Sequence, residues 1–438
     1  MQDHPLPPRS GISTSSTLAI DAATRGVRGR GATFNPANRF ETLSLEILPD
    51  DAGPASCGEP PLEIETVGQD GLGDWSGAGT LSGAGSRASA SESTQPDVEA
   101  AAVRVKTRVY RDAAKSIINK VDSPDVGFSW TVNPYRGCEH GCIYCYARPG
   151  HEYLGMSSGL DFESRIMAKF DAPDLLRKAM MKPSWQGETI ILSGVTDAYQ
   201  PVERTLGITR KVLEVMVEFR QPIAIITKSR LVLRDLDLLA KLNEHCAVSV
   251  AISLTTLDPG LARILEPRAA SPAHRLAAIR TLAEAGIPVR VMTAPLIPAI
   301  NDNELESLLE AAKQAGATNA GYVLIRLPHQ LKELFVRWLG THYPDRAAKV
   351  ESLIRQTRGG AMYDAKVGQR FCGTGPIAEM IKARFHLATA RLGLNEIIER
   401  GPSPFRRSPG WSGGVAAAAA ERKTKSDTGQ LFLFGSDC

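Results

Sequence analysis

Between residues 105 and 400, short apolar runs alternate with amphipathic segments, and this alternation constrains the fold more than any other feature of the chain. Near-continuous apolar runs are typical of strands buried on both faces of a parallel sheet, and the amphipathic segments are typical of connecting helices. Six βα units predict an α/β protein with a partial (β/α)6 barrel of the TIM type, whose catalytic groups lie at the carboxyl ends of the strands. The expected strands cover residues 129–134, 189–195, 223–229, 248–256, 288–297 and 320–327.

Residue types at the ends of the amphipathic segments predict where helices begin and end. Ser271 is expected to cap the start of one helix, and Gly286 is expected to end it. Another helix is expected over 202–219, because its apolar residues recur on one face at helical spacing.

The chain divides into a core and two tails of different composition. Residues 1–104 are rich in Gly, Ser, Ala and Pro, so we expect a largely disordered arm with a basic island at 25–41. That island is typical either of a segment that crosses a nucleic-acid backbone or of a solvated basic arm. We expect the partial barrel over 105–340, a helical C-terminal extension over 341–400, and a disordered tail over 401–438.

The overall composition is that of an ordinary soluble protein, with 43% hydrophobic and 23% charged residues. A formal net charge of +3 permits a nucleic-acid partner without indicating one. The sequence shows no signal-peptide pattern and no apolar run long enough to cross a bilayer, so we expect a cytoplasmic protein without membrane contact. Seven cysteines in a chain of 438 residues do not indicate a disulfide framework.

Three of the cysteines are clustered in the segment NPYRGCEHGCIYCYARP. Cys138, Cys142 and Cys145 follow the first expected strand directly, which places them at the catalytic end of the barrel. Thiolates ligate iron–sulfur clusters, and a cubane cluster needs four ligands, so this loop would leave one iron with an open position. A structural zinc site instead needs four protein ligands, of which His140 would be the fourth. The segment favours an iron–sulfur cluster over zinc or buried thiols.

The spacing CxxxCxΦC, in which Tyr144 is the aromatic residue Φ, resembles the hallmark of the radical S-adenosylmethionine (SAM) superfamily. The segments NPYRGCEHGCIYCYAR, LSGVTDAYQPVE and TAPLIPAINDNE are similar to the branch that includes spore photoproduct lyase and its uncharacterised bacterial relatives. The resemblance implies that the three cysteines hold a [4Fe–4S] cluster and that SAM binds the open iron. It also implies reductive cleavage of SAM to a 5′-deoxyadenosyl radical, which abstracts hydrogen from a substrate, and an electron donor of the flavodoxin or ferredoxin type.

After the second strand, this superfamily carries a Gly-Gly-Glu-like turn that binds the SAM amino group, whereas this chain reads SGVTD at 193–197. Gly194 permits close approach of a ligand, and Asp197 or Glu203 would supply the carboxylate if the backbone carbonyls do not suffice. An ordinary strand-ending turn is the alternative. The residues expected to contact SAM here are Ser193, Gly194, Thr196 and Asp197.

The end of the fourth strand offers a second group of polar residues. Ser253 and Thr255 alternate on the strand and suit ribose hydroxyls or the SAM carboxylate. Glu266 and Arg268 follow, and a guanidinium can grip a carboxylate through two hydrogen bonds. Arg275 is a competing candidate for that role.

Each of two further residues has either a functional or a purely structural interpretation. Ile297, at the end of the fifth strand, is expected in the apolar wall that this superfamily places against adenine, although such residues are also typical of a core. Cys372 lies in the glycine-lined segment VGQRFCGTGP, where a thiol near a radical would donate a hydrogen atom, as a cysteine of spore photoproduct lyase does. A lone cysteine is more often a small buried hydrophobe.

The tail carries an isolated apolar segment, Gln430–Phe434, after a long polar stretch. Its sequence QLFLF resembles the pentapeptide with which bacterial proteins bind the sliding clamp, and the alternative is that it docks back onto the core. A clamp-binding tail would hold the enzyme near DNA at high effective concentration.

The leading hypothesis is therefore a radical SAM enzyme that acts on DNA or RNA in repair or modification. The alternatives are a radical SAM enzyme of peptide or small-molecule metabolism, and a non-catalytic iron–sulfur protein that recruits partners through its tails. Members of one fold family differ in their substrate pockets, so the fold alone does not choose among them.

Overall fold

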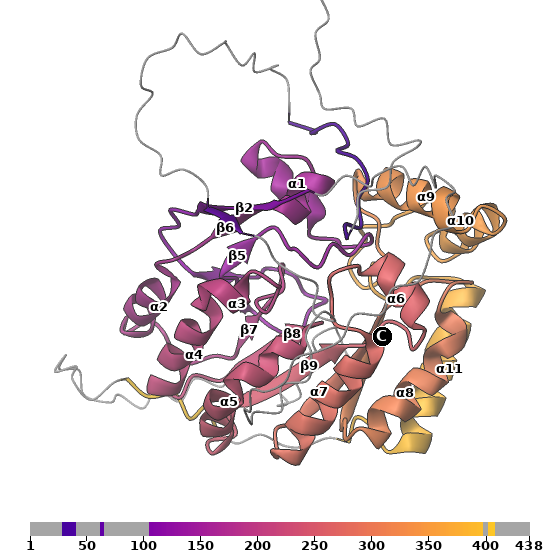
Figure 1. Cartoon of the computed structure of the whole chain (residues 1–438). Helices are drawn as coiled ribbons and strands as arrows, with labels where there is room; N and C mark the ends of the chain where they lie inside the picture. The colour runs from indigo at the N-terminus through magenta and orange to yellow at the C-terminus, as the bar shows by residue number, and fades with distance from the viewer. Residues whose placement is uncertain (1–28, 41–61, 65–104, 397–401, 408–438) are drawn as a thin grey trace, which may run out of the picture.

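All six expected strands are present and parallel in the computed structural model, so the prediction of an α/β fold with a partial barrel is confirmed (Figure 1). The structure describes residues 29–40, 62–64, 105–396 and 402–407. The strands pair in the order β11-β10-β9-β8-β7-β4, and the short strand β3 adds antiparallel at the β4 edge. These strands are β3 (Ile118–Lys120), β4 (Trp130–Val132), β7 (Ile190–Leu192), β8 (Ile223–Thr227), β9 (Val248–Ser253), β10 (Val289–Leu296) and β11 (Asn319–Leu324).

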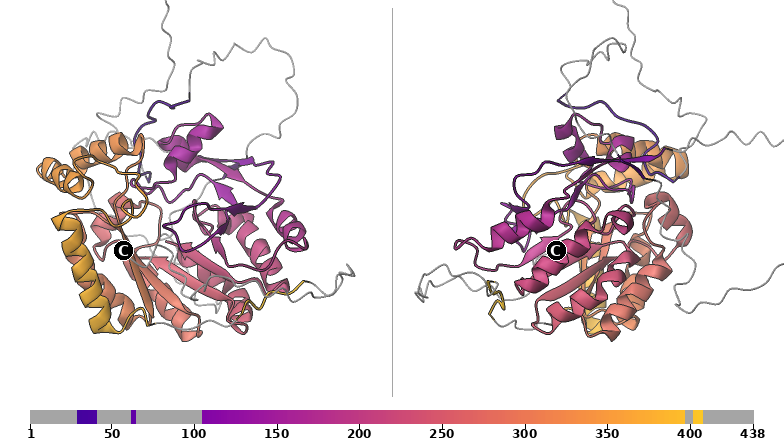
Figure 2. Two further views of the ribbon diagram at one scale, coloured as in Figure 1. Left: turned by 180° about the vertical axis from the view of Figure 1, so that it is seen from behind. Right: turned by 60° about the vertical axis from the view of Figure 1, so that its left-hand side comes forward.

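Helices cover the outer face of this sheet, and their buried sides form one core with the strands (Figure 2). The covering helices are α2 (Ala172–Met180), α3 (Glu203–Leu206), α4 (Ile208–Glu218), α5 (Leu236–Asn243), α7 (Pro272–Glu284), α8 (Leu305–Gln314) and α11 (Pro376–Leu392). Near the carboxyl ends of the strands lie α1 (Leu160–Ser164), α6 (Pro259–Leu265), α9 (Leu331–His342) and α10 (Ala347–Gln356). Short 3-10 helices cover Arg148–Leu154, Arg230–Asp235 and Asp302–Glu304.

The helix-end signals give one confirmed boundary and one correction. The Ser271 side chain accepts a hydrogen bond from the backbone of His274 at the start of α7, as expected of a cap. The helix expected over 202–219 is instead two helices, because Gly207 between them adopts a left-handed conformation with φ of 62°. Glycine reaches that region without steric cost, so the chain turns there and α4 starts afresh.

A second sheet of four strands, which the sequence did not lead us to expect, lies across the end of the barrel. Its order is β1-β2-β6-β5, and β5 passes directly into the cysteine segment. The cysteine segment therefore follows a short strand of the second sheet rather than the first barrel strand itself. The strands are β1 (Leu62–Ile64), β2 (Thr107–Arg111), β5 (Tyr135–Arg136) and β6 (Arg165–Ala168).

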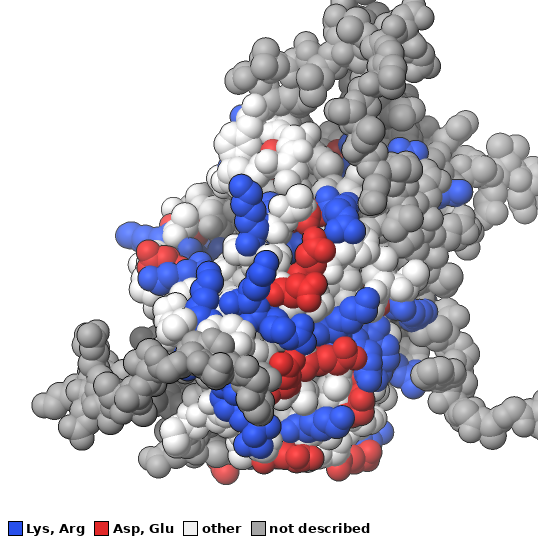
Figure 3. All heavy atoms as spheres, turned by 90° about the vertical axis from the view of Figure 1, so that its left-hand side faces the viewer, with Lys and Arg blue, Asp and Glu red and all other residues white. Residues whose placement is uncertain are grey.

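The surface on the side of α2 and α4 carries interleaved charges of both signs (Figure 3). Ion pairs link Arg177 to Glu218 at 2.8 Å and Arg210 to Asp237 at 2.8 Å, so many of these charges neutralise one another. This face is therefore not a continuous basic patch of the kind that binds a nucleic-acid backbone. Among the residues that the structure describes, no helix combines the length and the apolar composition that a membrane span requires.

Candidate functional site

A pocket opens at the carboxyl ends of the parallel strands, where barrel folds place their catalytic groups. It encloses about 980 Å³ of empty space, part of it open to solvent. The cysteine loop forms one wall, and the residues at the ends of β7, β8, β9, β10 and β11 form the others. Its polar and aromatic lining residues are Cys138, His140, Cys142, Tyr144, Cys145, Tyr146, Ser193, Thr196, Asp197, Thr227, Lys228, Ser253, Arg326 and Phe371.

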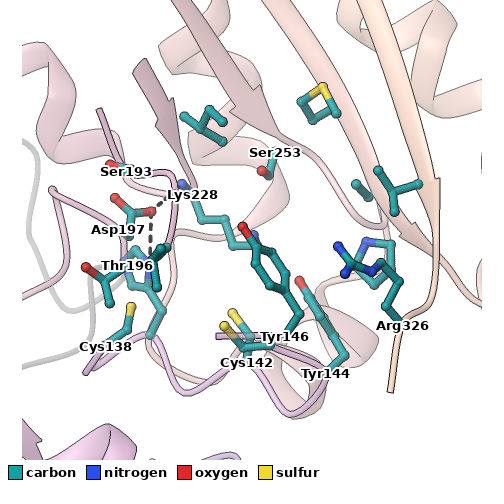
Figure 4. Close-up of a pocket in the computed structure, with 18 of the residues that line it drawn as sticks. Cys138, Cys142, Tyr144, Tyr146, Ser193, Thr196, Asp197, Lys228, Ser253 and Arg326 are labelled. Atoms are coloured by element: carbon teal, nitrogen blue, oxygen red, sulfur yellow. Dashed lines mark hydrogen bonds and ion pairs between the residues drawn. The ribbon is translucent and has the colours of Figure 1, made fainter. Parts of the chain in front are cut away.

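The three clustered cysteines are free thiols that line this one pocket. Figure 4 shows two of them, Cys138 and Cys142. Two glycines permit the sharp turns around them, since Gly137 and Gly141 have φ of 78° and 67°. The loop is tied to its surroundings by the Cys138 amide, which donates to the Phe162 carbonyl at 2.9 Å. These contacts fix the loop backbone and leave the sulfur atoms facing the pocket.

Burial keeps the thiols of Cys138 and Cys142 protonated at neutral pH. It raises the pKa of Cys138 well above its usual value and that of Cys142 to about 12, and in both cases nearby negative groups add to the effect. Thiolates, not thiols, bind metals, so a bound metal group would have to displace these protons. Metal binding at this loop is therefore expected to release protons.

A segment far away in sequence lies directly behind the cysteine loop. Residues 29–40, here called the strap, dock against it, although composition predicted a largely disordered arm over residues 1–104. The amides of Gly31 and Ala32 donate to the Glu163 carboxylate at 3.0 and 2.7 Å. Arg30 is buried, and its guanidinium donates to the carbonyl of Glu163 and at 2.9 Å to the Thr107 hydroxyl. This arginine of the basic island is consequently not available to a nucleic acid.

Glu163 connects the strap to the cysteine loop. Its fully buried carboxylate pairs with Arg148, whose side chain is also fully buried. Arg148 in turn donates to the backbone carbonyls of Cys142 at 2.9 Å and Gly141 at 3.1 Å. A chain of buried charge-assisted hydrogen bonds thus runs from the strap to the backbone of the cysteine loop.

The strap fits this loop too closely to admit a larger residue. A Cβ atom on Gly31 would lie 1.8 Å from the Gly141 carbonyl oxygen, far inside any van der Waals contact. Ala32 is fully buried and packs in the same apolar cluster as Cys142, Ile143 and Tyr144. The strap is therefore part of the wall behind the pocket.

Asp197, expected to contact SAM, lines the pocket, and both of its carboxylate oxygens accept hydrogen bonds from the protein (Figure 4). It accepts hydrogen bonds from the Thr227 hydroxyl at 2.8 Å, the Lys228 amide at 2.8 Å and the Tyr199 amide at 2.9 Å. The His140 ring nitrogen Nδ1 lies 3.3 Å away. Burial opposes ionisation, but His140 and these donors outweigh it and lower the pKa of Asp197. The carboxylate is ionised and joins the β7 loop to β8 and the cysteine loop.

The turn over residues 193–197 is not an ordinary strand-ending turn in its backbone. Ser193 has φ of 74°, a region that residues other than glycine rarely adopt, and its hydroxyl accepts a hydrogen bond from the Ala198 amide at 2.8 Å. Ser193 and Thr196 line the pocket, and their contact with SAM stays a prediction. Gly194 is not among the lining residues, but its carbonyl accepts a hydrogen bond from the Tyr146 hydroxyl at 2.6 Å.

Tyr144 lines the pocket and stands on a buried polar network. Its hydroxyl donates to Glu266, which also accepts a hydrogen bond from Thr255 at 2.7 Å and pairs with Arg275. Arg275 is almost fully buried and donates to the Ser253 carbonyl at 3.1 Å. Glu266 and Thr255, expected to contact SAM, therefore support Tyr144 and the β9 strand end from behind and do not line the pocket.

Four other predicted residues have different surroundings. Ser253 lines the pocket, whereas Arg268 lies behind the cysteine loop, 3.3 Å from the carboxylate of Glu139. Ile297 is fully buried in an apolar cluster and does not line the pocket. Cys372 is also not a lining residue, although its neighbour Phe371 is, and the structure has its sulfur in a disulfide. The proposed role of Cys372 stays a prediction.

Sequence reasoning missed several side chains of the pocket. His140 was considered only as a zinc ligand, yet its buried Nε2 has no hydrogen-bond partner, while Nδ1 faces Asp197. Lys228 follows β8 and places its ammonium 5.8 Å from the Tyr144 ring centroid. Tyr146 and Arg326 were not singled out at all. A charged residue one or two positions past a buried strand was the available signal for Lys228 and Arg326.

The donor set suits a cluster more than a single ion. Among the described residues, no three His, Cys, Asp or Glu side chains are arranged to hold one metal ion. Three thiols around a pocket suit a cluster, because its cysteine ligands bind different iron atoms and need not converge on one point. The buried Nε2 of His140 beside them has no hydrogen-bond partner in the protein, and a buried polar atom is normally satisfied by a partner such as a bound ligand.

Comparison with known proteins identifies similar chains. Residues 132–312 match the family model described as "Radical SAM superfamily". Uncharacterised proteins of Mycobacterium tuberculosis and Mycobacterium bovis are 36% identical over 245 residues, which is 55% of this chain and 72% of each relative. An uncharacterised protein of Methanocaldococcus jannaschii is 32% identical over 199 residues, which is 45% of this chain and 71% of that relative.

A solved structure is similar over a larger part of the chain. Spore photoproduct lyase complexed with dinucleoside spore photoproduct has 16% identity and a TM-score of 0.48. The similarity covers 65% of this chain and 80% of that one.

Proposed function

The chain belongs to the radical SAM superfamily, and from that premise we propose that it is an enzyme that holds a [4Fe–4S] cluster and SAM in this pocket and acts on a nucleic acid. The observation that carries the proposal is the set of three free cysteines on one pocket at the carboxyl ends of six parallel strands. Cys138, Cys142 and Cys145 would ligate the cluster.

When bound, the cluster and SAM supply the reductive cleavage that yields a 5′-deoxyadenosyl radical for hydrogen abstraction. The residues of the chain provide the surroundings. Ser193, Thr196, Ser253 and Lys228 line the pocket, where they can bind the polar groups of SAM. The network behind Tyr144 fixes one wall, so the site is organised before a ligand enters.

The pocket also has to keep water from reactive intermediates. Its apolar lining residues Ile226, Met292, Val323 and Leu324 belong to β8, β10 and β11 and offer no hydrogen bonds to water from their side chains. A substrate that closes the open side of the pocket would complete the exclusion of solvent.

A nucleic-acid substrate is supported by the cationic lining residue Arg326, which lies away from the cysteine end. A peptide or a small metabolite remains the second candidate, because apolar lining residues suit those substrates as well. We propose a flavodoxin or ferredoxin as the electron donor, since cleavage of SAM needs one electron at low potential.

We also propose that the tail segment Gln430–Phe434, which lies outside the described residues, binds a sliding clamp. Deletion of residues 430–434 is then expected to abolish co-purification with the clamp and to leave the iron content unchanged. Clamp binding by the shortened chain would contradict this part of the proposal.

The central test is anaerobic reconstitution of the full chain with iron and sulfide, followed by reduction with dithionite in the presence of SAM. We expect 5′-deoxyadenosine to form, and we expect single-stranded DNA or RNA to raise its yield. Reconstituted protein that forms no 5′-deoxyadenosine with any substrate class would contradict the activity. A yield raised only by peptides or metabolites would favour the second candidate.

A further inference from the structure

One end of the pocket carries an arginine that no described acidic residue neutralises. Arg326 follows β11 and lies on the side of the pocket opposite Asp197 (Figure 4). Its guanidinium carbon lies 4.5 Å from the ring centroid of Phe371 and 5.2 Å from that of Tyr146. Two aromatic rings therefore hold the guanidinium in place by cation–π contacts.

The charge of Arg326 lacks carboxylate partners of the kind that Arg234, another half-buried arginine, has. Among the described residues, no carboxylate forms an ion pair with it, and its buried Nε atom has no hydrogen-bond partner. By contrast, Arg234 pairs with both Glu203 and Asp235. A partly desolvated cation without a partner costs free energy, which an anionic ligand would offset.

A second arginine makes this end of the pocket more positive. Arg358 is buried behind β11, where its guanidinium donates to the carbonyl oxygens of Ile325 at 2.8 Å and Gln369 at 2.9 Å. Burial and the charge of Arg326 lower the pKa of Arg358 to about 10, so it remains a cation at neutral pH. Two cations at one end of a pocket create a field that attracts an anion.

Apolar surface lies next to this positive end. Tyr146 and Val195 both line the pocket and are 46% and 49% exposed. The hydroxyl of Tyr146 donates to the Gly194 carbonyl, so the ring is held in one orientation with part of its surface open. An exposed aromatic ring beside a guanidinium is the combination on which nucleobases stack while a phosphate binds the cation.

Arg326 is also separate from the groups that would serve SAM. Lys228 lies at the cysteine end, where its ammonium faces the Tyr144 ring and its amide binds Asp197. That lysine can neutralise a SAM carboxylate without help from Arg326. The arginine at the opposite end is then left for the substrate.

We propose that Arg326, held by Phe371 and Tyr146, binds a backbone phosphate of a nucleic-acid strand whose adjacent base stacks on Tyr146. The proposal rests on the proposed function and names the part of the site that recognises its substrate. A base inside a duplex cannot reach a pocket of this kind, so the substrate strand is single-stranded or has its target nucleotide turned out of the helix.

The test measures binding of a fluorescein-labelled single-stranded oligodeoxynucleotide to the anaerobically reconstituted full chain over a range of salt concentrations. Arg326→Met is expected to weaken binding at least about tenfold and to lower the slope of log K against log salt by about one, because one phosphate contact is lost. Arg326→Lys retains the charge without the guanidinium fork, so its affinity for the oligonucleotide should lie between those of wild type and Arg326→Met. Arg355→Met is the matched control, since Arg355 is a half-exposed surface residue of α10.

A second probe tests the chemical class of the ligand. An oligonucleotide of the same sequence with uncharged methylphosphonate linkages should bind wild type and Arg326→Met equally. Equal loss of affinity in Arg326→Met and Arg355→Met would overturn the proposal, and so would a peptide carboxylate that depends on Arg326 when the oligonucleotide does not.

Equilibrium dialysis separates this proposal from the proposed function. We expect Arg326→Met to bind SAM as wild type does, because Lys228 and not Arg326 lies at the cysteine end of the pocket. Loss of SAM binding in Arg326→Met would assign the guanidinium to the cofactor and overturn the proposal. Absence of 5′-deoxyadenosine from wild type would instead contradict the proposed function.

Discussion

The two ends of the pocket differ in whether their buried charges are paired. At the cysteine end, the buried carboxylates of Glu163 and Glu266 are each paired with a buried arginine. At the β11 end, Arg326 has aromatic neighbours and no described carboxylate partner. Paired charges hold a loop in place without a ligand, whereas an unpaired, partly buried charge is stabilised when a ligand of opposite charge binds. The comparison indicates that the cysteine end is built in advance and that the β11 end is completed by what binds there.

The largest effect is expected from the cysteines themselves. Replacing Cys138, Cys142 or Cys145 with Ala should reduce the iron content of reconstituted protein to background and abolish SAM cleavage, because three thiolates are needed to hold the cluster. Cys246→Ala is the control, since Cys246 is exposed and outside the pocket. Iron content and 5′-deoxyadenosine are the measurements. A triad variant that keeps both at the level of Cys246→Ala would contradict the assignment.

Next in size is the buried pair behind the loop. Glu163→Gln leaves Arg148 buried without its counter-charge and should lower the free energy of unfolding by about 3–5 kcal/mol. Urea unfolding of the apo-protein measures the loss. Glu306→Gln removes the carboxylate of a partly exposed pair with Arg384 and should cost about 1 kcal/mol or less. Similar losses in the two variants would show that the cysteine end does not depend on its buried charges.

A buried histidine at the cysteine end makes stability depend on pH. His151 packs edge-on against Phe162, and burial lowers its pKa from 6.5 to about 4. Between these values the unfolded chain binds a proton that the folded chain does not, so stability falls as pH drops from 6.5 towards 4. The loss attributable to His151 is about 3 kcal/mol, since one pKa unit corresponds to about 1.4 kcal/mol.

Urea unfolding at pH 7 and pH 4.5 measures this contribution. His151→Gln should make stability less dependent on pH over that interval, whereas His386→Gln, at an exposed position, should not. An unchanged pH dependence in His151→Gln would show that the ring is already accessible to protons in the folded state.

The smallest effect concerns the fit of the strap. In Gly31→Ala the new methyl group meets the Gly141 carbonyl, so the strap must shift at a cost of about 1–3 kcal/mol. The same substitution at Gly340, within α9 and with open space around it, should stabilise the chain by up to about 1 kcal/mol. Urea unfolding gives both values. The same sign of change at both positions would mean that the strap does not pack as described.

The barrel was predictable because its signals are local. Apolar runs such as those of β8 and β9 are legible in sequence, since a strand covered on both faces has to be apolar along its whole length. The Ser271 cap was predictable for a similar reason, because its hydrogen bond spans three residues. The second sheet was not, since β2 and β6 are short and their pairing joins segments more than fifty residues apart.

The candidate site was predictable only in part, and the residues show why. Cys138, Cys142 and Cys145 are close in sequence, so one loop brings them together and their spacing reports it. Glu266 and Arg268 were expected at the ligand, but the tertiary structure turns Glu266 towards Tyr144 and Arg268 towards Glu139. The sequence shows that Glu266 and Arg268 are charged, but it does not show in which direction their side chains point.

The sequence by itself determined the parallel α/β core and the loop that would hold a metal cluster, because strand burial and ligand spacing are properties of neighbouring residues. Only the tertiary structure decided that the strap at residues 29–40 closes the back of the cysteine loop and that Arg326 faces the pocket without a carboxylate. Both depend on contacts between residues remote in sequence, whose formation is set by how whole elements pack.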